Sequence, residues 1–457
     1  MHHTEPSAVD ARLARGRRSS GRIVRALAAA VVLPLALGLA ACGGTPEPQA
    51  PPAPVRTNPV DPNKQYEISF LWWGGEARAK LTEDALALYT KKYPNVKFKT
   101  TWQANQGYFD KLATLVAGND APDIFQIDDN YLTEYAGRAA LDLTPYQQSG
   151  NLDTSKFPES LWKYGVVDNK LVGVAFGENT PGMVFSKTKL QELGVEEPQT
   201  GWSWEKLISW GATVTTKSGG TYYGTMDPSA DYKALWMWLR QQGKDLYVDG
   251  KLGFNEQDLT KWFQLWKGAR DTKAAPPADI IFEANGGDVT KQIVVTGKGG
   301  TSFMWANQMP ELAKNTKDTL GVVAYPGDPS AQWGRASMYF SVFKGSSNRD
   351  VAVDVIDFLA NDPEAGKILG TDRGLPSNLD VRKLVQDTVT DPNMKTTIAF
   401  QTELGSKFGQ APAVPPSGHA TVRSEIRKAA EEVQYGRAEP AAAAATFFTA
   451  ANAALNK

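Results

Sequence analysis

Hydrophobic residues in the first part of the chain body are grouped in a way that predicts a strand followed by a helix. Residues 68–73 form an almost continuous apolar run, which is typical of a strand covered on both faces. From Glu76 onward, apolar residues recur at intervals of three or four positions, as in an amphipathic helix. Pro94 cannot continue that helix, so we expect the helix to end just before it.

The same alternation continues along the chain, and its order predicts the fold class. Side chains alternate at 96–102 as in a second strand, the segment 109–117 has a helical pattern, and 124–127 is expected to form a third strand. Strands that alternate with helices favour right-handed crossovers and a parallel sheet. Later segments repeat the pattern, with a strand expected at 301–305 and helices at 255–266, 351–358, 422–433 and 441–455.

The composition narrows the classes of function. A chain of 457 residues is long enough for two or three domains, and 42% hydrophobic with 22% charged residues is typical of a soluble globular protein. The net charge of −1 argues against a nucleic-acid-binding protein that depends on positive charge. One Cys excludes an internal disulfide and a Cys₄ zinc site. Two of the three His are at the N-terminus, so we expect no metal and no cofactor.

Aromatic residues are plentiful in this chain, with 13 Trp, 15 Tyr and 18 Phe. Catalysis that uses a histidine has only His419 to draw on, because His2 and His3 stand at the extreme N-terminus. The composition therefore favours the binding of a ligand by ring stacking over chemical catalysis.

The N-terminus has the pattern of an export signal followed by a lipid anchor. Six arginines within residues 12–25 precede the uncharged run 26–41, which is shorter than the ~20 apolar residues that span a bilayer. The run ends in LAACGG at 39–44, which resembles a bacterial lipobox, whose Cys receives diacylglycerol. We therefore expect residues 1–41 to be a signal peptide for the general secretory path and Cys42 to be lipidated. Seven prolines within residues 43–62 predict that 42–62 form an extended tether.

Short motifs in the body of the chain occur in a recognisable order. They are FLWWGGE at 70–76, ALALYTKKYP at 85–94, YFDKL at 108–112, AGNDAPDI at 117–124, GENTPGMVFSK at 177–187, FMWANQ at 303–308, DPEAG at 362–366 and GLPSN at 374–378. Together they resemble the extracellular solute-binding proteins of sugar ABC transporters, the relatives of maltose-binding protein. The resemblance covers essentially the whole body of the chain.

That resemblance implies an α/β fold of the two-lobed periplasmic-binding-protein type, with class II topology, a hinge and a central ligand cleft. Lobe 1 would comprise 63–176 plus 338–375, and lobe 2 would comprise 177–337 plus 376–457. It also implies a protein without enzymatic activity that binds a carbohydrate, an oligosaccharide above a monosaccharide, and delivers it to the transmembrane subunits of an ABC permease. We expect a monomer on the extracellular face of the cell membrane, held there by its lipid anchor alone.

Candidate ligand contacts follow the predicted strands. A sugar offers an apolar face for stacking and a rim of hydroxyls for carboxylates, amides and guanidinium groups. In an α/β sheet, ligands lie beyond the carboxyl ends of the strands. Trp73 ends the first strand and Glu76 follows it, Gln103 follows the second strand, and Asp128 and Asp129 stand at the end of the third. Glu76 could equally complement the dipole of its own helix, and two adjacent Asp often form a turn and a helix cap.

Seven further candidates come from the resemblance and from the aromatic pattern: Asn179, Tyr232, Trp236, Trp305, Asn307, Trp333 and Arg335. Tyr232 and Trp236 are four residues apart on one helix face, where core packing is the alternative. Arg335 is expected in a Gly- and Ser-rich loop, where an exposed salt bridge is the alternative. Trp262 and Trp266 fit the apolar stripe of their helix, so we expect them in the core.

Two other classes of function stay open at this stage. The ligand could be another small solute, namely a polyamine, an organic anion or glycerol phosphate. An anion site needs several converging cationic groups, of which the sequence places only Arg335. The chain could also be a secreted glycoside-active enzyme that uses Asp128 or Glu76. Neighbouring residues at a strand end point in different directions, which argues against two acids that flank one glycosidic bond.

Overall fold

A computed structural model describes residues 57–286 and 288–456 of the chain. The predicted signal peptide, Cys42 and most of the predicted tether lie outside these residues. The described strands are β1 (Tyr66–Trp73), β2 (Val96–Gln103), β3 (Ile124–Ile127), β4 (Val166–Val167), β5 (Lys170–Leu171), β6 (Val174–Ala175), β7 (Glu178–Asn179), β8 (Pro181–Ser186), β9 (Tyr247–Val248), β10 (Lys251–Leu252), β11 (Thr301–Trp305), β12 (Leu320–Val323), β13 (Arg335–Ala336) and β14 (Tyr339–Val342).

The α-helices confirm the helical segments expected from the sequence, with ends that differ by a few residues. They are α1 (Glu76–Lys92), α2 (Tyr108–Ala117), α3 (Leu132–Arg138), α4 (Thr144–Gln148), α5 (Glu159–Trp162), α6 (Lys187–Glu192), α7 (Trp204–Lys217), α8 (Tyr232–Arg240), α9 (Glu256–Asp271), α10 (Ala278–Ala284), α11 (Ile293–Thr296), α12 (Met309–Lys314), α13 (Arg349–Asn361), α14 (Pro363–Leu369), α15 (Leu379–Thr388), α16 (Pro392–Gly405), α17 (His419–Gln434) and α18 (Pro440–Leu455). Among the described residues, no helix has the length and apolar character needed to cross a membrane.

The first sheet has the strand order β2-β1-β3-β14-β6. Strands β2 and β3 run parallel to β1, as predicted, whereas β14 is antiparallel to β3 and to β6. The parallel arrangement predicted for the first three strands is confirmed, and strands β14 and β6, which join through antiparallel pairs, extend the sheet. Strand β14 does not follow β3 through a helical crossover, because some two hundred residues separate the two strands along the chain and β14 enters the sheet directly after β13.

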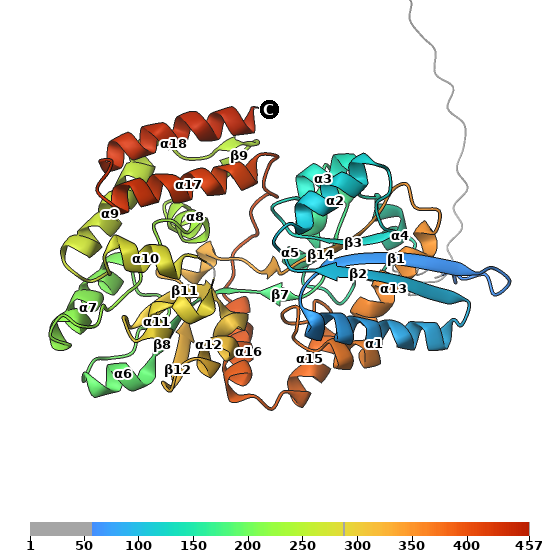
Figure 1. Cartoon of the computed structure of the whole chain (residues 1–457), viewed down its shortest axis with the longest axis horizontal. Helices are drawn as coiled ribbons and strands as arrows, with labels where there is room; N and C mark the ends of the chain where they lie inside the picture. The colour runs from blue at the N-terminus through green and yellow to red at the C-terminus, as the bar shows by residue number, and fades with distance from the viewer. Residues whose placement is uncertain (1–56, 287, 457) are drawn as a thin grey trace, which may run out of the picture. The chain divides into compact units, whose positions relative to one another are not determined.

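Both faces of the first sheet are buried. Phe70 and Trp72 of β1 enter a hydrophobic cluster with α1, α13 and α14, whereas Leu71 enters a second cluster with α2 and α3. Figure 1 shows α1 and α13 beside β1 and β2. Burial on both faces explains why the run 68–73 is apolar without alternation.

The second sheet consists of β8 between β11 and β12, and all pairs in it are antiparallel. Its hydrophobic cluster is rich in aromatic rings supplied by α7, α8 and α9. Trp262 and Trp266 are fully buried in this cluster, which confirms the prediction that they are core residues. Their rings lie edge to face with that of Trp204, with centroids 5.3 and 5.9 Å apart.

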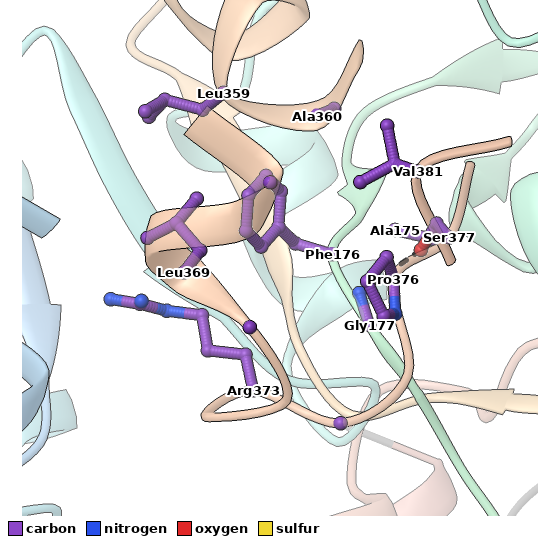
Figure 2. A pocket seen from close by; sticks show the side chains of 13 residues that line it. Ala175, Phe176, Gly177, Leu359, Ala360, Leu369, Arg373, Pro376, Ser377 and Val381 are labelled. Carbon is purple, nitrogen blue, oxygen red and sulfur yellow. Dashed lines mark hydrogen bonds between the residues drawn. The ribbon is translucent and has the colours of Figure 1, made fainter. Parts of the chain in front are cut away.

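Three segments of the chain meet where it passes between the two sheets (Figure 1). Strand β7 pairs with β13, and Glu178 of β7 also bridges to Leu375. Figure 2 shows the neighbouring packing, in which the backbone N–H of Gly177 donates to Ser377 Oγ (3.0 Å) beside a cavity of about 30 Å³. Gly374 has φ +99°, and a Cβ there would lie 2.5 Å from the Glu178 carbonyl oxygen, so this crossing requires glycine.

The end of the predicted tether differs from expectation. Val60 is only 4% exposed and packs in the hydrophobic cluster beneath α1 and α13. The backbone N–H of Asp61 donates to Tyr66 Oη (3.2 Å), and that of Thr57 donates to Asn151 Oδ1 (3.0 Å). The apolar side chain of Val60 thus ties the last residues before β1 to the folded body.

Candidate ligand-binding site

Arg335 is the point where predicted site residues from both sheets meet. Its Nη1 donates to Tyr232 Oη (2.7 Å), and its Nη2 forms an ion pair with Asp129. Its guanidinium carbon lies 5.0 Å from the ring centroid of Trp305. The expectation that Arg335 lies in a loop was wrong, because it is 8% exposed and belongs to β13, which β7 holds in place.

Each partner of Arg335 stands at the end of an element. Asp129 follows β3, Tyr232 is the first residue of α8, and Trp305 is the last residue of β11. The start of α8 is fixed by Asp231, whose carboxylate accepts from the backbone N–H of Lys233 (2.9 Å). Strand and helix ends from different parts of the chain therefore converge on one guanidinium.

The electrostatics of this cluster follow from its burial. Burial by itself lowers the pKa of Arg335, but Asp129 and Tyr232 outweigh it and hold that pKa well above the usual value. Burial first, and then the carboxylate of Asp129, raise the pKa of Asp128 to about 6, against the opposing charge of Arg423. Arg335 therefore keeps its positive charge beside Asp129, while the pKa of Asp128 lies close to neutral pH.

An open hollow of about 550 Å³ lies beside these residues. Tyr232 and Trp305 contribute aromatic rings to its wall, and Lys233 Nζ lies 5.2 Å from the ring centroid of Trp305. Polar groups complete the lining, among them Asp231, Asn285, Gln292, Gln308, Arg423 and Arg427. Rings next to amides and guanidinium groups suit a ligand with an apolar face and a hydroxyl rim.

Asn179 and Asn307 form a second contact near Arg335. Asn179 Nδ2 donates to Asn307 Oδ1 (2.9 Å), and Asn179 is the register partner of Arg335 in the β7–β13 pair. The structure therefore brings six predicted residues to one region of the molecule: Asp129, Asn179, Tyr232, Trp305, Asn307 and Arg335. Asp128, next to Asp129, lies close enough to Arg423 and Arg335 for their charges to lower its pKa.

Two predicted residues lie instead in the aromatic core. Trp236 is 1% exposed and Trp333 is 5% exposed, and their ring centroids are 4.9 Å apart. The indole N–H of Trp236 donates to Asp245, and Arg240 lies 5.2 Å from the ring centroid of Trp333. Neither ring lines the hollow, because the helices packed around α8 enclose both of them in the aromatic cluster.

Three further predicted residues stand at the carboxyl end of the first sheet. Trp73 and Gln103 are register partners in the β1–β2 pair. The ring of Trp73 is partly buried against Tyr108, with centroids 5.2 Å apart, and Glu76 is exposed in the first turn of α1. Trp73 and Gln103 thus lie side by side at the end of the sheet formed by β1 and β2, and β3 separates these strands from β14.

Arg423 and Lys233 line the hollow, and sequence reasoning did not select them. Arg423 lies on α17 with its guanidinium carbon 4.5 Å from the ring centroid of Tyr232. In the sequence it is one of several charged residues on the polar side of an amphipathic helix, so nothing in the pattern distinguishes it. His419 is fully buried, with Nδ1 2.6 Å from Tyr247 Oη. Burial, followed by the charges of Arg423 and Arg335, lowers its pKa well below the usual value, so it is neutral.

Comparisons with known proteins identify the family to which the chain belongs. The family description "Bacterial extracellular solute-binding protein" matches residues 84–396. The structure of an extracellular solute-binding protein, family 1, from Alicyclobacillus acidocaldarius is 25% identical in sequence, with 87% of this chain and 100% of that chain covered and a TM-score of 0.70.

Two further solved structures share the fold at lower identity. A periplasmic oligogalacturonide-binding protein from Yersinia enterocolitica, in complex with saturated digalacturonic acid, is 19% identical over 86% of this chain and 99% of that chain, with a TM-score of 0.72. An ABC substrate-binding protein from Listeria monocytogenes, in complex with cycloalternan, is 19% identical over 86% of this chain and 100% of that chain, with a TM-score of 0.71. The family match spans more than half of the sequence, so this chain belongs to the bacterial extracellular solute-binding proteins, the binding components of ABC transporters.

Proposed function

We propose that the chain binds an oligosaccharide in the hollow beside Arg335 and delivers it, unchanged, to the transmembrane subunits of an ABC permease. The observation that carries this proposal is the wall formed by Tyr232 and Trp305 next to guanidinium, ammonium and amide groups. The rings can stack on the apolar faces of sugar units while the polar groups bind hydroxyls. The oligosaccharide complexes of the Yersinia and Listeria proteins support the choice of ligand.

A binding role without chemistry also agrees with the state of the acidic residues. Asp129 is paired with Arg335, so its carboxylate is occupied. Asp128 accepts from the backbone N–H of Asn130 (3.0 Å), which turns its carboxylate toward its own loop. Glycosidases need two carboxyl groups on opposite sides of one bond, and this adjacent pair is committed to other partners.

We further propose that the three crossing segments form a hinge between lobe 1 (63–176 plus 338–375) and lobe 2 (177–337 plus 376–457). A saccharide that contacts lobe 1 together with Trp305 of lobe 2 would bias the hinge toward closure. Small-angle scattering with and without saccharide tests this, because closure reduces the radius of gyration. An unchanged radius in the presence of saturating ligand would contradict the hinge.

Cys42 supports the proposal of a lipid anchor on the extracellular face of the membrane, where the protein would act as a monomer. Replacing it tests this directly, because Cys42→Ser removes the sulfur that would carry the lipid. We expect the wild-type protein in the membrane fraction and the variant in the medium. Retention of the variant in the membrane would contradict the anchor.

A panel of oligosaccharides tests the binding function itself. Ligand that binds only the folded protein raises the free energy of unfolding, by about 2.7 kcal/mol at a hundredfold excess over Kd. Thermal unfolding and tryptophan fluorescence should both respond to the correct sugar, and chromatography should recover that sugar unaltered. Turnover of the sugar, or a response to none of the panel, would contradict the proposal.

A further inference from the structure

The charged groups around the hollow differ in whether they already have a partner. Asp227 forms an ion pair with Arg270, and Asp231 pairs with Lys233 (2.7 Å). Arg427 pairs with Glu431 (2.8 Å). These lining groups therefore neutralise one another or are neutralised by neighbours.

Arg423 is the exception among the charged groups that line the hollow. It is partly buried, and its Nε is shielded from solvent without any hydrogen-bond acceptor in the part of the chain that the structure describes. No carboxylate of the described residues forms an ion pair with it, although its guanidinium group is stacked over Tyr232 at 4.5 Å. A partly desolvated guanidinium with free donors is costly to keep, and an incoming acceptor would relieve that cost.

The charges that face Arg423 do not fill this role. Asp128 is close enough for Arg423 to lower its pKa, but its carboxylate accepts from the backbone N–H of Asn130 and forms no ion pair with Arg423 among the described residues. Asp129 is committed to Arg335. His419, on the same helix, is neutral. Arg423 therefore lines the hollow with an Nε that donates to no group of residues 57–286 and 288–456.

We infer that the site prefers saccharides that carry a carboxylate, such as uronic acid units, and that Arg423 binds that carboxylate. The inference rests on the proposed saccharide-binding function and specifies the class of its ligand. A planar guanidinium matches a carboxylate by two parallel N–H···O bonds, which neutral hydroxyls cannot reproduce. Trp305, which lines the same hollow, provides a stacking surface for the sugar ring that bears the acid.

Matched pairs of ligands test this inference. Disaccharides of galacturonic, glucuronic and mannuronic acid, and the carboxyl-reduced counterpart of each, differ only in the acid group. We expect calorimetry to show at least tenfold tighter binding of one acidic disaccharide than of its reduced counterpart. In Arg423→Gln this preference should fall to less than threefold. Raising NaCl from 0.05 to 0.3 M should weaken binding of the acidic member only.

Lys428→Gln is the matched control, because it removes one positive charge from the same helix at an exposed position paired with Glu425. It should keep the preference for the acidic ligand. Thermal unfolding of both variants establishes that each is folded. Equal or tighter binding of the neutral member, or an equal loss for both members in Arg423→Gln, overturns the inference while the saccharide function stands. If the protein binds neither member of any pair and no neutral oligosaccharide, both the inference and the proposed saccharide-binding function are overturned.

Discussion

Arg335 and Arg423 approach the same tyrosine, and they differ in what else surrounds them. Arg335 donates to Tyr232 and is paired with Asp129, so its charge is neutralised inside the protein. Arg423 lies over the ring of Tyr232, and no carboxylate of the described residues forms an ion pair with it. The comparison teaches that one guanidinium joins elements of the fold, while the other has donors to offer to a ligand.

The largest effect on stability is expected for Arg335, the arginine that is paired within the protein. Arg335→Ala leaves the carboxylate of Asp129 buried without its counter-charge, and we expect a loss of about 3–5 kcal/mol in the free energy of unfolding. Urea denaturation followed by tryptophan fluorescence measures it. Lys407→Ala, which removes an exposed pair with Glu403, should cost less than about 1 kcal/mol. A loss of similar size in the two variants would show that the Asp129–Arg335 pair does not join the elements.

The next effect concerns the ring of Trp305, which Lys233 and Arg335 both approach. Trp305→Ala removes a stacking surface from the hollow, and we expect the affinity for saccharide to fall by about 2 kcal/mol, roughly thirtyfold. Titration calorimetry measures the change. Trp102→Ala is the control, because Trp102 is 41% exposed and lies on β2, away from the hollow. Unchanged affinity in Trp305→Ala would remove Trp305 from the site.

A smaller effect separates Asp128 from its neighbour Asp129. The folded protein raises the pKa of Asp128 to about 6, so between about pH 4 and 6 the folded state binds more protons than the unfolded state. Asp128 therefore stabilises the fold at low pH and loses that contribution as pH rises through 6. At pH 7.5, Asp128→Asn should be more stable than the wild type by about 1–2 kcal/mol.

Denaturation at pH 4 and pH 7.5 measures the effect of Asp128. The advantage of Asp128→Asn should be small at pH 4, where the wild-type carboxyl is already protonated. An advantage of Asp128→Asn that is independent of pH would contradict the titration of Asp128.

The smallest effect is expected for a paired arginine on the helix that carries Arg423. Arg427 forms an exposed pair with Glu431 four residues along α17. Such pairs contribute about 0.3–0.5 kcal/mol, so Arg427→Ala should change the free energy of unfolding by less than about 1 kcal/mol. Thermal denaturation measures it, and a loss above 2 kcal/mol would mean that pairing on α17 is not a surface effect.

Local patterns were sufficient to predict much of the fold. The apolar run before Gly74 became β1, and the helical spacing after Glu76 became α1. The apolar face of α9 that carries Trp262 and Trp266 is buried, as the helical spacing of its apolar residues predicted. The antiparallel course of β14 was not predicted, because strand direction depends on which distant strand it pairs with and not on its own residues.

The candidate site was predictable only in part. Asp129 and Trp305 were selected because they end strands, and the ends of strands converge. Trp236 was selected because it shares a helix face with Tyr232, yet the layer of helices around α8 encloses it. Arg423 was not selected, because its surroundings come from residues far away in sequence.

The sequence by itself determined the order of strands and helices, the aromatic supply and the motifs of the family, because these depend on residue type and local spacing. The tertiary structure alone decided which charges are paired. Arg335 and Asp129 stand 206 positions apart, and Arg423 is distant in sequence from the ring of Tyr232 over which it lies. Electrostatic energy depends on distance in space and on burial, and chain packing alone fixes both.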